Sequence, residues 1–558
     1  MASPHDPLLL VSSPSTKDKP HGKACKLILL SSTLAAVLCL AALGAVQVTT
    51  DQKQSHPADL CAFSPNLSSC QTVVSDVLAA GNSQLGPHST ADLVQVLIRR
   101  SLRQLDAAAV AAGGIQGRLN GSGRKQAALA DCVQLMDVSR DRLVGADAAV
   151  GSSSLADAHS WLSAVLTNYV TCLDGLDGDA REDLAESHVK PLMELASASL
   201  AVLVTMKPNS GDDQLTKLVF TFPSWVSTRD RKLLAVDPQA AKAVQANVVV
   251  AQDGSGKYKT LQAAVDAAPD KSASRYVIYV KKGVYKETVR LSKQKTNIMI
   301  VGDGQDATII TGSLNFIDGT TTFESATLAA AGDGFILQDI RIQNTAGPQK
   351  HQAVALRVSA DKAVINRCKI EAYQDTLYTH TLRQFYRDST ISGTVDFIFG
   401  DAGVVFQNCD LVARKPMSNQ QNLVTAQGRT DPNQNTGTSI QNCRVVPSAD
   451  LAPLKGTIPS YLGRPWKEYS RTVFLQSDID GHIAKEGWKE WEGSFALRTL
   501  YYGEYANRGA GAGTAARVKW PGYHVITDAK VAQAFTVGQL IQGGAWLKGT
   551  GVAYTEGL

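Results

Sequence analysis

The stretch QDTLYTHTLRQFYRDSTISGTVDFIFG (374–400) indicates the fold of the longest part of this chain. It holds two aspartates, Asp375 and Asp396, which lie 21 residues apart. A hexapeptide pattern precedes each aspartate and recurs in the sequence, with an apolar residue at its first and sixth positions. Its copies align without gaps: LQDIRI (337–342), INRCKI (365–370), YRDSTI (386–391), FQNCDL (406–411) and IQNCRV (440–445).

The spacing of apolar residues within these hexapeptides predicts strands. Alternation over the fourth to sixth positions is the period of a strand with one buried face. The copies recur at irregular intervals of 20 to 34 residues, which is typical of a solenoid with loops of varying length. A stack of extended coils that each contribute such a strand is a parallel β-helix.

This register places the two aspartates together. Asp375 follows Ile370 by five residues, and Asp396 follows Ile391 by five, so they occupy the same position on consecutive coils. Neighbouring strands lie about 4.8 Å apart. Because two carboxylates that close do not both ionise readily, one becomes a proton donor while the other stays an anion that can attack. The alternative interpretation is a stack of exposed aspartates in turns.

The length and charge of the chain limit its class. Its 558 residues predict more than one domain. A net charge of +4 is too small to indicate a nucleic-acid partner, but it suits an acidic polymer.

The N-terminal residues predict a membrane anchor. Residues 1–26 form a lysine-bearing cytoplasmic tail in this interpretation, and residues 27–46 carry no charge. A helix of about 20 apolar residues can span a bilayer, and lysines before it keep the N-terminus in the cytoplasm. A cleaved signal peptide is the alternative. The remainder would then enter the secretory pathway, where disulfides form and the sequons at Asn66 and Asn120 can be glycosylated.

The middle of the chain changes character twice. Residues 51–205 are rich in Ala and Leu with helical spacing of apolar residues, which predicts an all-α bundle of four or more helices. Residues 206–240 are predicted to form a linker. Its basic cluster, RDRKLL (229–234), is either a protease site or a run of solvent-exposed charges. Residues 241–558 are β-rich and carry the hexapeptides.

The β-rich region resembles plant pectin methylesterases. The matching motifs, in order, are GVYKE (283–287), QAVALR (352–357), QDTLYTH (374–380), GTVDFIFG (393–400) and LGRPW (462–466).

The helical region resembles the pectin methylesterase inhibitor domain, and this resemblance implies the pairs Cys61/Cys70 and Cys132/Cys172. The whole chain is similar to the long form of the enzyme, in which an inhibitor-like pro-region precedes the catalytic domain. RKLL (231–234) resembles the processing motif of that group, which implies a subtilase-type protease as a partner.

The resemblance also implies a fold, a reaction and a set of site residues. The fold is a right-handed parallel β-helix, and the reaction removes methyl esters from homogalacturonan without a cofactor or metal. It assigns Asp396 as nucleophile and Asp375 as general acid and then base. The other implied site residues are two glutamines for the oxyanion, an arginine that holds Asp396, and two contacts to the sugar chain: Gln352, Gln374, Arg464, Thr322 and Trp466.

The implied biology places a precursor in Golgi membranes, with the helical pro-region inhibiting the enzyme inside the same chain, and a product in the cell wall. Two other functions compete with this one. The first is another β-helix enzyme on the same polymer, a polygalacturonase or a lyase. The second is a non-enzymatic wall protein that binds other esterases through its helical domain. Release of methanol without shortening of the chains distinguishes the esterase from the first, and assays of the separated halves of the chain distinguish it from the second.

The cysteines of the β-rich region give a further expectation. Cys368, Cys409 and Cys443 all occupy the fourth position of their hexapeptides. Cys409 and Cys443 would be neighbours on adjacent coils, about 4.8 Å apart, inside the usual Cα range for a disulfide. We therefore predict a Cys409–Cys443 bridge and a buried free thiol at Cys368.

Overall fold

The computed structural model describes residues 57–80, 89–118, 123–206 and 245–558. The predicted cytoplasmic tail, the anchor at 27–46, the RKLL motif and Asn120 lie outside the described residues. No helix in the described ranges is long and apolar enough to cross a membrane. Pro57 to Leu558 form one compact unit, in which we call 57–206 the helical region and 245–558 the β-helix region.

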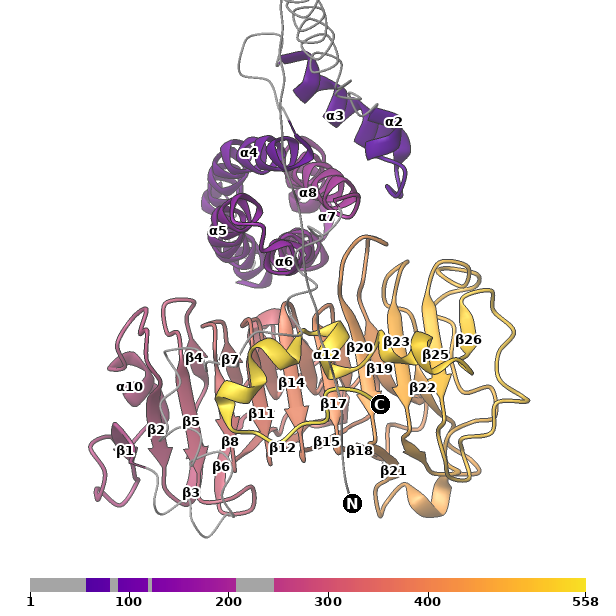
Figure 1. Cartoon of the computed structure of the whole chain (residues 1–558). Helices are drawn as coiled ribbons and strands as arrows, with labels where there is room; N and C mark the ends of the chain where they lie inside the picture. The colour runs from indigo at the N-terminus through magenta and orange to yellow at the C-terminus, as the bar shows by residue number, and fades with distance from the viewer. Residues whose placement is uncertain (1–56, 81–88, 119–122, 207–244) are drawn as a thin grey trace, which may run out of the picture. The chain divides into compact units, whose positions relative to one another are not determined.

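The helical region is a bundle, as its Ala- and Leu-rich sequence predicts. Its four long helical segments surround a common core of apolar side chains (Figure 1). These segments are α4 (Thr90–Arg118), α5 (Gly123–Gly151), α6 (Leu155–Asp174) and the run formed by α7 (Gly178–Leu184), η1 (Ala185–Val189) and α8 (Lys190–Leu203). Two shorter helices precede them, α2 (Pro57–Leu60) and α3 (Leu67–Ala80).

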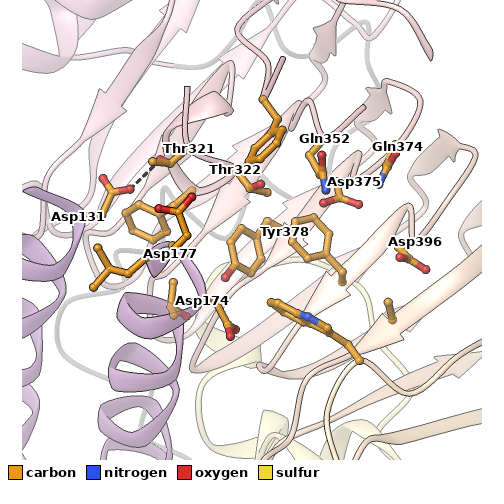
Figure 2. A pocket seen from close by; sticks show the side chains of 18 of the residues that line it. Asp131, Asp174, Asp177, Thr321, Thr322, Gln352, Gln374, Asp375, Tyr378 and Asp396 are labelled. Carbon is orange, nitrogen blue, oxygen red and sulfur yellow. Dashed lines mark hydrogen bonds between the residues drawn. The ribbon is translucent and has the colours of Figure 1, made fainter. Parts of the chain in front are cut away.

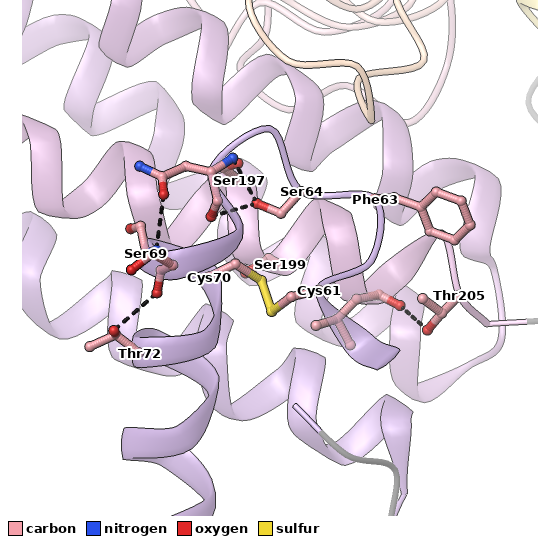
Figure 3. The surroundings of a disulfide bond; sticks show 12 residues. Cys61, Phe63, Ser64, Ser69, Cys70, Thr72, Ser197, Ser199 and Thr205 are labelled. Atoms are coloured by element: carbon pink, nitrogen blue, oxygen red, sulfur yellow. Dashed lines mark hydrogen bonds between the residues drawn. A yellow bond between two sulfur atoms is a disulfide. The ribbon is translucent and has the colours of Figure 1, made fainter. Parts of the chain in front are cut away.

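Two disulfides hold this bundle, and both confirm the implied pairs. Cys132 on α5 is bonded to Cys172 on α6. Cys61, directly after α2, is bonded to Cys70 on α3 (Figure 3). Asn66 is exposed, and its side-chain oxygen accepts a hydrogen bond from the Ser69 amide at the start of α3.

The β-helix region winds through three parallel sheets, which confirms the parallel solenoid predicted from the hexapeptides (Figure 1). The 11-stranded sheet contains β1 (Val248–Val250), β2 (Tyr276–Val280), β5 (Ile298–Gly302), β8 (Ile336–Gln338), β11 (Ala363–Asn366), β14 (Arg383–Arg387), β17 (Gly403–Gln407), β20 (Gly437–Gln441), β23 (Arg471–Leu475), β25 (Tyr501–Tyr505) and β26 (Tyr523–Val525). The 8-stranded sheet contains β3 (Gly283–Lys286), β6 (Thr308–Gly312), β9 (Arg341–Asn344), β12 (Lys369–Glu371), β15 (Thr390–Gly393), β18 (Asp410–Ala413), β21 (Arg444–Pro447) and β24 (Asp478–Ile479). The 7-stranded sheet contains β4 (Val289–Leu291), β7 (Leu328–Ala330), β10 (Leu356–Val358), β13 (Leu377–Thr379), β16 (Ile398–Gly400), β19 (Asn422–Gln427) and β22 (Ser460–Gly463).

Short helices complete the β-helix region at its edges and loops. They are α10 (Leu261–Asp266), η4 (Phe323–Ser325), η5 (Pro348–Lys350), η6 (Ala452–Leu454), α11 (Ala529–Gln533), α12 (Val537–Leu540), η7 (Gly543–Ala545) and η8 (Leu547–Thr550).

Each hexapeptide turns a corner and so is not a single strand. Its first two residues end a strand of the 11-stranded sheet, and its last two begin a strand of the 8-stranded sheet. The third residue lies between them with a positive φ, from 48° to 56°, in all five copies: Asp339, Arg367, Asp388, Asn408 and Asn442. The left-handed conformation there bends the chain, so the alternation predicted from the sequence begins only after the bend.

The predicted coil register is correct, but the predicted Cys409–Cys443 disulfide is wrong. Asp410 pairs with Arg444, so the two cysteines are neighbours, and the Cys409 amide lies 3.3 Å from Cys443 Sγ. Both are nevertheless buried free thiols, as is Cys368. In-register side chains leave the sheet in parallel, which keeps their Cβ atoms about 4.8 Å apart, beyond the usual disulfide range of about 3.5–4.5 Å.

Candidate functional site

Asp375 and Asp396 lie at equivalent positions on adjacent coils, each just before a strand of the 7-stranded sheet. Leu377 pairs with Ile398, which sets the two aspartates in register, and the Asp375 amide donates to the Val395 carbonyl at 3.0 Å. Both aspartates have positive φ, 60° and 51°. This conformation is uncommon for a non-glycine residue and is found preferentially at functional sites.

The two carboxylates belong to a cavity of about 530 Å³. Figure 2 shows them with Gln352 and Gln374 beside them. The structure brings all the site residues implied by the sequence into the lining of this one cavity: Thr322, Gln352, Gln374, Asp375, Asp396, Arg464 and Trp466.

Arg464 distinguishes the two aspartates. Its Nε donates to Asp396 Oδ1 at 2.8 Å and its Nη2 donates to Oδ2 at 2.6 Å. This fork holds both carboxylate oxygens and fixes the orientation of Asp396. The Trp491 ring lies 4.2 Å from the guanidinium carbon of Arg464 and packs against its face.

Burial and charge give the two carboxyls different proton affinities. Burial raises the pKa of Asp375 well above its usual range, and the neighbouring charge of Asp396 raises it further. Burial also raises the pKa of Asp396, against the opposing effect of its hydrogen bonds and charge pairing with Arg464. Burial outweighs the arginine, so the pKa of Asp396 is raised although Arg464 holds its carboxylate. Because the guanidinium bonds go to Asp396, they favour the ionised form at Asp396 over Asp375.

Aromatic side chains line the cavity beside the carboxylates. Tyr378 and Phe399 stack with ring centroids 4.2 Å apart on the outer face of β13 and β16, and Trp466 meets both edge-on. A Cβ on Gly428 would lie 2.8 Å from the Trp466 ring, so glycine there allows the indole to lie against the backbone. Sequence reasoning found Trp466 and missed the other two, although strand alternation in LYT and IFG points them outward.

The helical region completes the wall of this cavity. Figure 2 shows Asp131 from α5, and Asp174 and Asp177 from the end of α6 and the following turn. Asp131 Oδ2 accepts a hydrogen bond from Thr321 at 2.6 Å, and burial raises the pKa of Asp131 to about 7. Asp174 Oδ1 lies 2.6 Å from Lys467 Nζ. The α5–α6 side of the bundle therefore forms part of the wall of the cavity that holds the carboxylate pair.

Further polar contacts fasten the two regions together. Arg142 on α5 forms a two-bond ion pair with Asp333 at 2.6 and 2.7 Å. Asp157 on α6 accepts from Arg383 at 2.6 Å. Other hydrogen bonds join α6 to the β-helix region along the helix: Trp161 to Asp361, Thr167 to Asp401, and Thr171 beside His380.

Two buried carboxyl groups in register on a parallel β-helix, beside an aromatic wall, are typical of an enzyme that acts on sugar chains. Comparison with known proteins narrows this class. The sequence model described as Pectinesterase matches residues 247–544, and the model described as Plant invertase/pectin methylesterase inhibitor matches 55–202. The chain belongs to the pectinesterase family.

Relatives match both regions together. Pectinesterase/pectinesterase inhibitor 18 of Arabidopsis thaliana is 51% identical over 568 residues and covers 100% of both chains. Pectinesterase 2.1 of Solanum lycopersicum is 55% identical over 90% of each. These matches give no support to a polygalacturonase, a lyase or a purely inhibitory protein.

Among solved structures, a pectin methylesterase from carrot is 59% identical with a TM-score of 0.56. It covers 56% of this chain and 99% of its own. The solved carrot chain is thus a folded protein whose match takes up little more than half of this chain.

Proposed function

We propose that this pectin methylesterase hydrolyses methyl esters of homogalacturonan with Asp396 as nucleophile and Asp375 as proton carrier. The products are methanol and demethylated pectin. The observation that supports this assignment is the Arg464 fork on Asp396, at 2.8 and 2.6 Å, beside a second buried carboxyl whose pKa lies well above its usual range. One carboxylate is held as an anion and the other keeps a proton, which are the two states that the reaction needs.

The first step is attack on the ester. An Asp396 oxygen bonds to the carbonyl carbon, and the carbonyl oxygen becomes an oxyanion. The side-chain amides of Gln352 and Gln374, which line the cavity with the aspartates, donate hydrogen bonds to that oxyanion. Thr322 and Trp466 contact the sugar chain and hold the ester in place.

The second step releases methanol, and the third restores the enzyme. The protonated Asp375 gives its proton to the departing methoxide, because methoxide is too basic to leave alone. This leaves an acyl anhydride on Asp396 and a carboxylate on Asp375. Asp375 then takes a proton from a water molecule, whose oxygen attacks the anhydride carbonyl carbon. The Asp396 carboxylate is freed, and the sugar keeps the new carboxyl group, whose remaining proton goes to solvent and leaves a free carboxylate.

We also propose that the helical region keeps the enzyme inactive until the linker is cut. Asp131 and Asp174 support this, because they line the same cavity and are held there by Thr321 and Lys467 of the β-helix region. A subtilase-type protease acting near 231–234, in the linker outside the described residues, would release the β-helix region. Two disulfides favour an oxidising compartment, in keeping with a Golgi precursor held by the 27–46 anchor and a product in the cell wall.

The test compares methanol release by the full chain and by residues 245–558 alone, on methylated pectin. We expect the shorter chain to be active. The uncut full chain should release methanol at least about tenfold more slowly, because in it the helical region forms part of the cavity wall and hinders access of the polymer. Equal rates would refute the inhibition, and no methanol from either chain would refute the esterase.

A matched pair of variants of the full chain separates docking from general destabilisation. Arg142→Ala with Asp157→Ala removes three ion pairs between the regions, to Asp333, Arg383 and Lys362. It should raise the activity of the uncut chain. Arg99→Ala removes an ion pair inside the helical region, with Asp147, and should leave the uncut chain as slow as before.

A further inference from the structure

A second cavity, of about 480 Å³, shares no lining residue with the cavity that holds the two aspartates. Most of its wall comes from the β-helix region: the turn at 429–435, Arg471 at the start of β23, and the segment around α12. The helical region adds three residues, Phe63, His159 and Val204. The described residues of this wall include two arginines, Arg429 and Arg471, and no acidic residue.

The two guanidinium groups bind backbone carbonyls and not carboxylates. Arg429 is 8% exposed, and its Nε donates to the Gln434 carbonyl at 3.0 Å. The Nε of Arg471 donates to the Thr436 carbonyl at 2.7 Å. Within the described ranges, the Nη groups of Arg471 make no hydrogen bond and neither arginine forms an ion pair. Donors on Arg471 therefore remain for a ligand in the cavity that it lines.

The two positive charges also act on each other. Burial lowers the pKa of Arg471 well below its usual range, and the charge of Arg429 lowers it further. Burial lowers the pKa of Arg429 as well. Burying a cation costs free energy unless an anion pairs with it. Two buried cations that weaken each other therefore favour the entry of an anion.

Two carboxylates influence the arginines without pairing with them. Asp401 and Asp431 both oppose the fall in the pKa of Arg429. Asp401 accepts hydrogen bonds from Gln434 at 2.7 Å and from Thr436. Asp431 accepts the Asn433 amide at 2.8 Å. Since these carboxylates are held by hydroxyl and amide donors, an anion in the cavity would not have to displace either from an arginine.

We propose that Arg429 and Arg471 form a binding site for an oxyanion, either the carboxylate of an acidic sugar or inorganic phosphate. The planar guanidinium donates to both kinds of oxyanion. The free Nη groups of Arg471 supply the donors, and the charge of Arg429 adds to the attraction. The site lies outside the reacting cavity, so this inference does not depend on the proposed esterase function.

The first test measures binding of inorganic phosphate and of digalacturonate to the full chain by calorimetry, at one ionic strength kept with sodium chloride. Arg471→Gln should weaken the binding about tenfold or more, because charge-assisted hydrogen bonds are lost. The control Arg498→Gln changes an exposed arginine outside this cavity and should bind as the wild type does. Tighter binding of digalacturonate would identify a sugar carboxylate as the ligand, and tighter binding of phosphate would identify phosphate.

A second variant keeps the inference testable if Arg471→Gln does not fold. Gln539→Glu places a carboxylate in the cavity wall from an exposed position on α12. It should raise the Tm of the anion-free chain, weaken binding of both anions, and reduce the rise in Tm that phosphate gives the wild type. Gln533→Glu, an exposed position on α11 outside the cavity, is its control. A wild type that binds neither anion, or affinities unchanged by Arg471→Gln and Gln539→Glu, would overturn the inference.

Discussion

Replacing Arg464 by glutamine tests whether the fork on Asp396 sets the protonation of the pair. The substitution removes two charge-assisted hydrogen bonds, at 2.8 and 2.6 Å, and leaves a buried carboxylate without its cation. Each such bond contributes about 1.5–3 kcal/mol, and about 1.4 kcal/mol corresponds to tenfold in rate. If half of that interaction is lost in the transition state, kcat/KM falls about 10- to 150-fold.

The pH dependence of the Arg464→Gln variant gives the sharper readout. Arg464 opposes the upward shift of the Asp396 pKa, so its removal raises that pKa further. Asp396 must be ionised to attack, so the acid limb of the kcat/KM profile for methanol release should move to higher pH. The matched control is Arg444→Gln, which removes an equivalent two-bond fork to Asp410 on the exposed 8-stranded sheet. An Arg464→Gln enzyme with an unmoved acid limb and over half of wild-type kcat/KM would refute the assignment.

Three further predictions concern other parts of the site. Asp375→Ala and Asp396→Ala should each abolish methanol release with the fold intact, and the double variant should be little worse than either, which single-turnover assays and circular dichroism can check; a single variant with a tenth of wild-type activity would contradict the roles. The pKa of Asp131 is raised to about 7, so between pH 4 and pH 7 the folded full chain keeps a proton that the unfolded chain has released. The Tm of the full chain should therefore be lower at pH 7 than at pH 5. Asp131→Asn should make this difference in Tm smaller. Gly428→Ala puts a Cβ 2.8 Å from the Trp466 ring, so KM should rise about 3- to 10-fold with kcat less affected; an unchanged KM would show that the indole position is unimportant.

The repeat in the sequence was enough to predict the coil stack and the proximity of the two aspartates. A solenoid repeats the same short-range pattern on every coil, so aligned hexapeptides such as those ending at Ile370 and Ile391 give the register directly. The corner at the third residue was not predicted. A positive φ at Arg367 or Asn408 has only a weak sequence preference behind it, and nothing in polar residues alone distinguishes a bend from a strand.

The docking of the helical region could not be read from the sequence in any detail. Asp174 and Lys467 are 293 residues apart, and neither position has a local pattern that marks a partner. The predicted Cys409–Cys443 disulfide was wrong because the Cα spacing alone does not give the direction of the two side chains. The aromatic pair Tyr378 and Phe399 was within reach of strand alternation, but alternation does not tell which outer face is a cavity wall.

The equivalent positions of Asp375 and Asp396 on adjacent coils have a consequence for how the protein tolerates change. Their separation is set by the backbone ladder between β13 and β16, and not by the loops that leave the sheets. Loop length already varies widely, since β17 and β20 pair directly although 34 residues separate Phe406 from Ile440. Insertions, deletions or grafted loops between coils can therefore reshape the cavity and change which polymer it binds, while Asp375 and Asp396 keep their spacing. Removing a strand from the ladder between β13 and β16, or adding one to it, would destroy the spacing of the two aspartates.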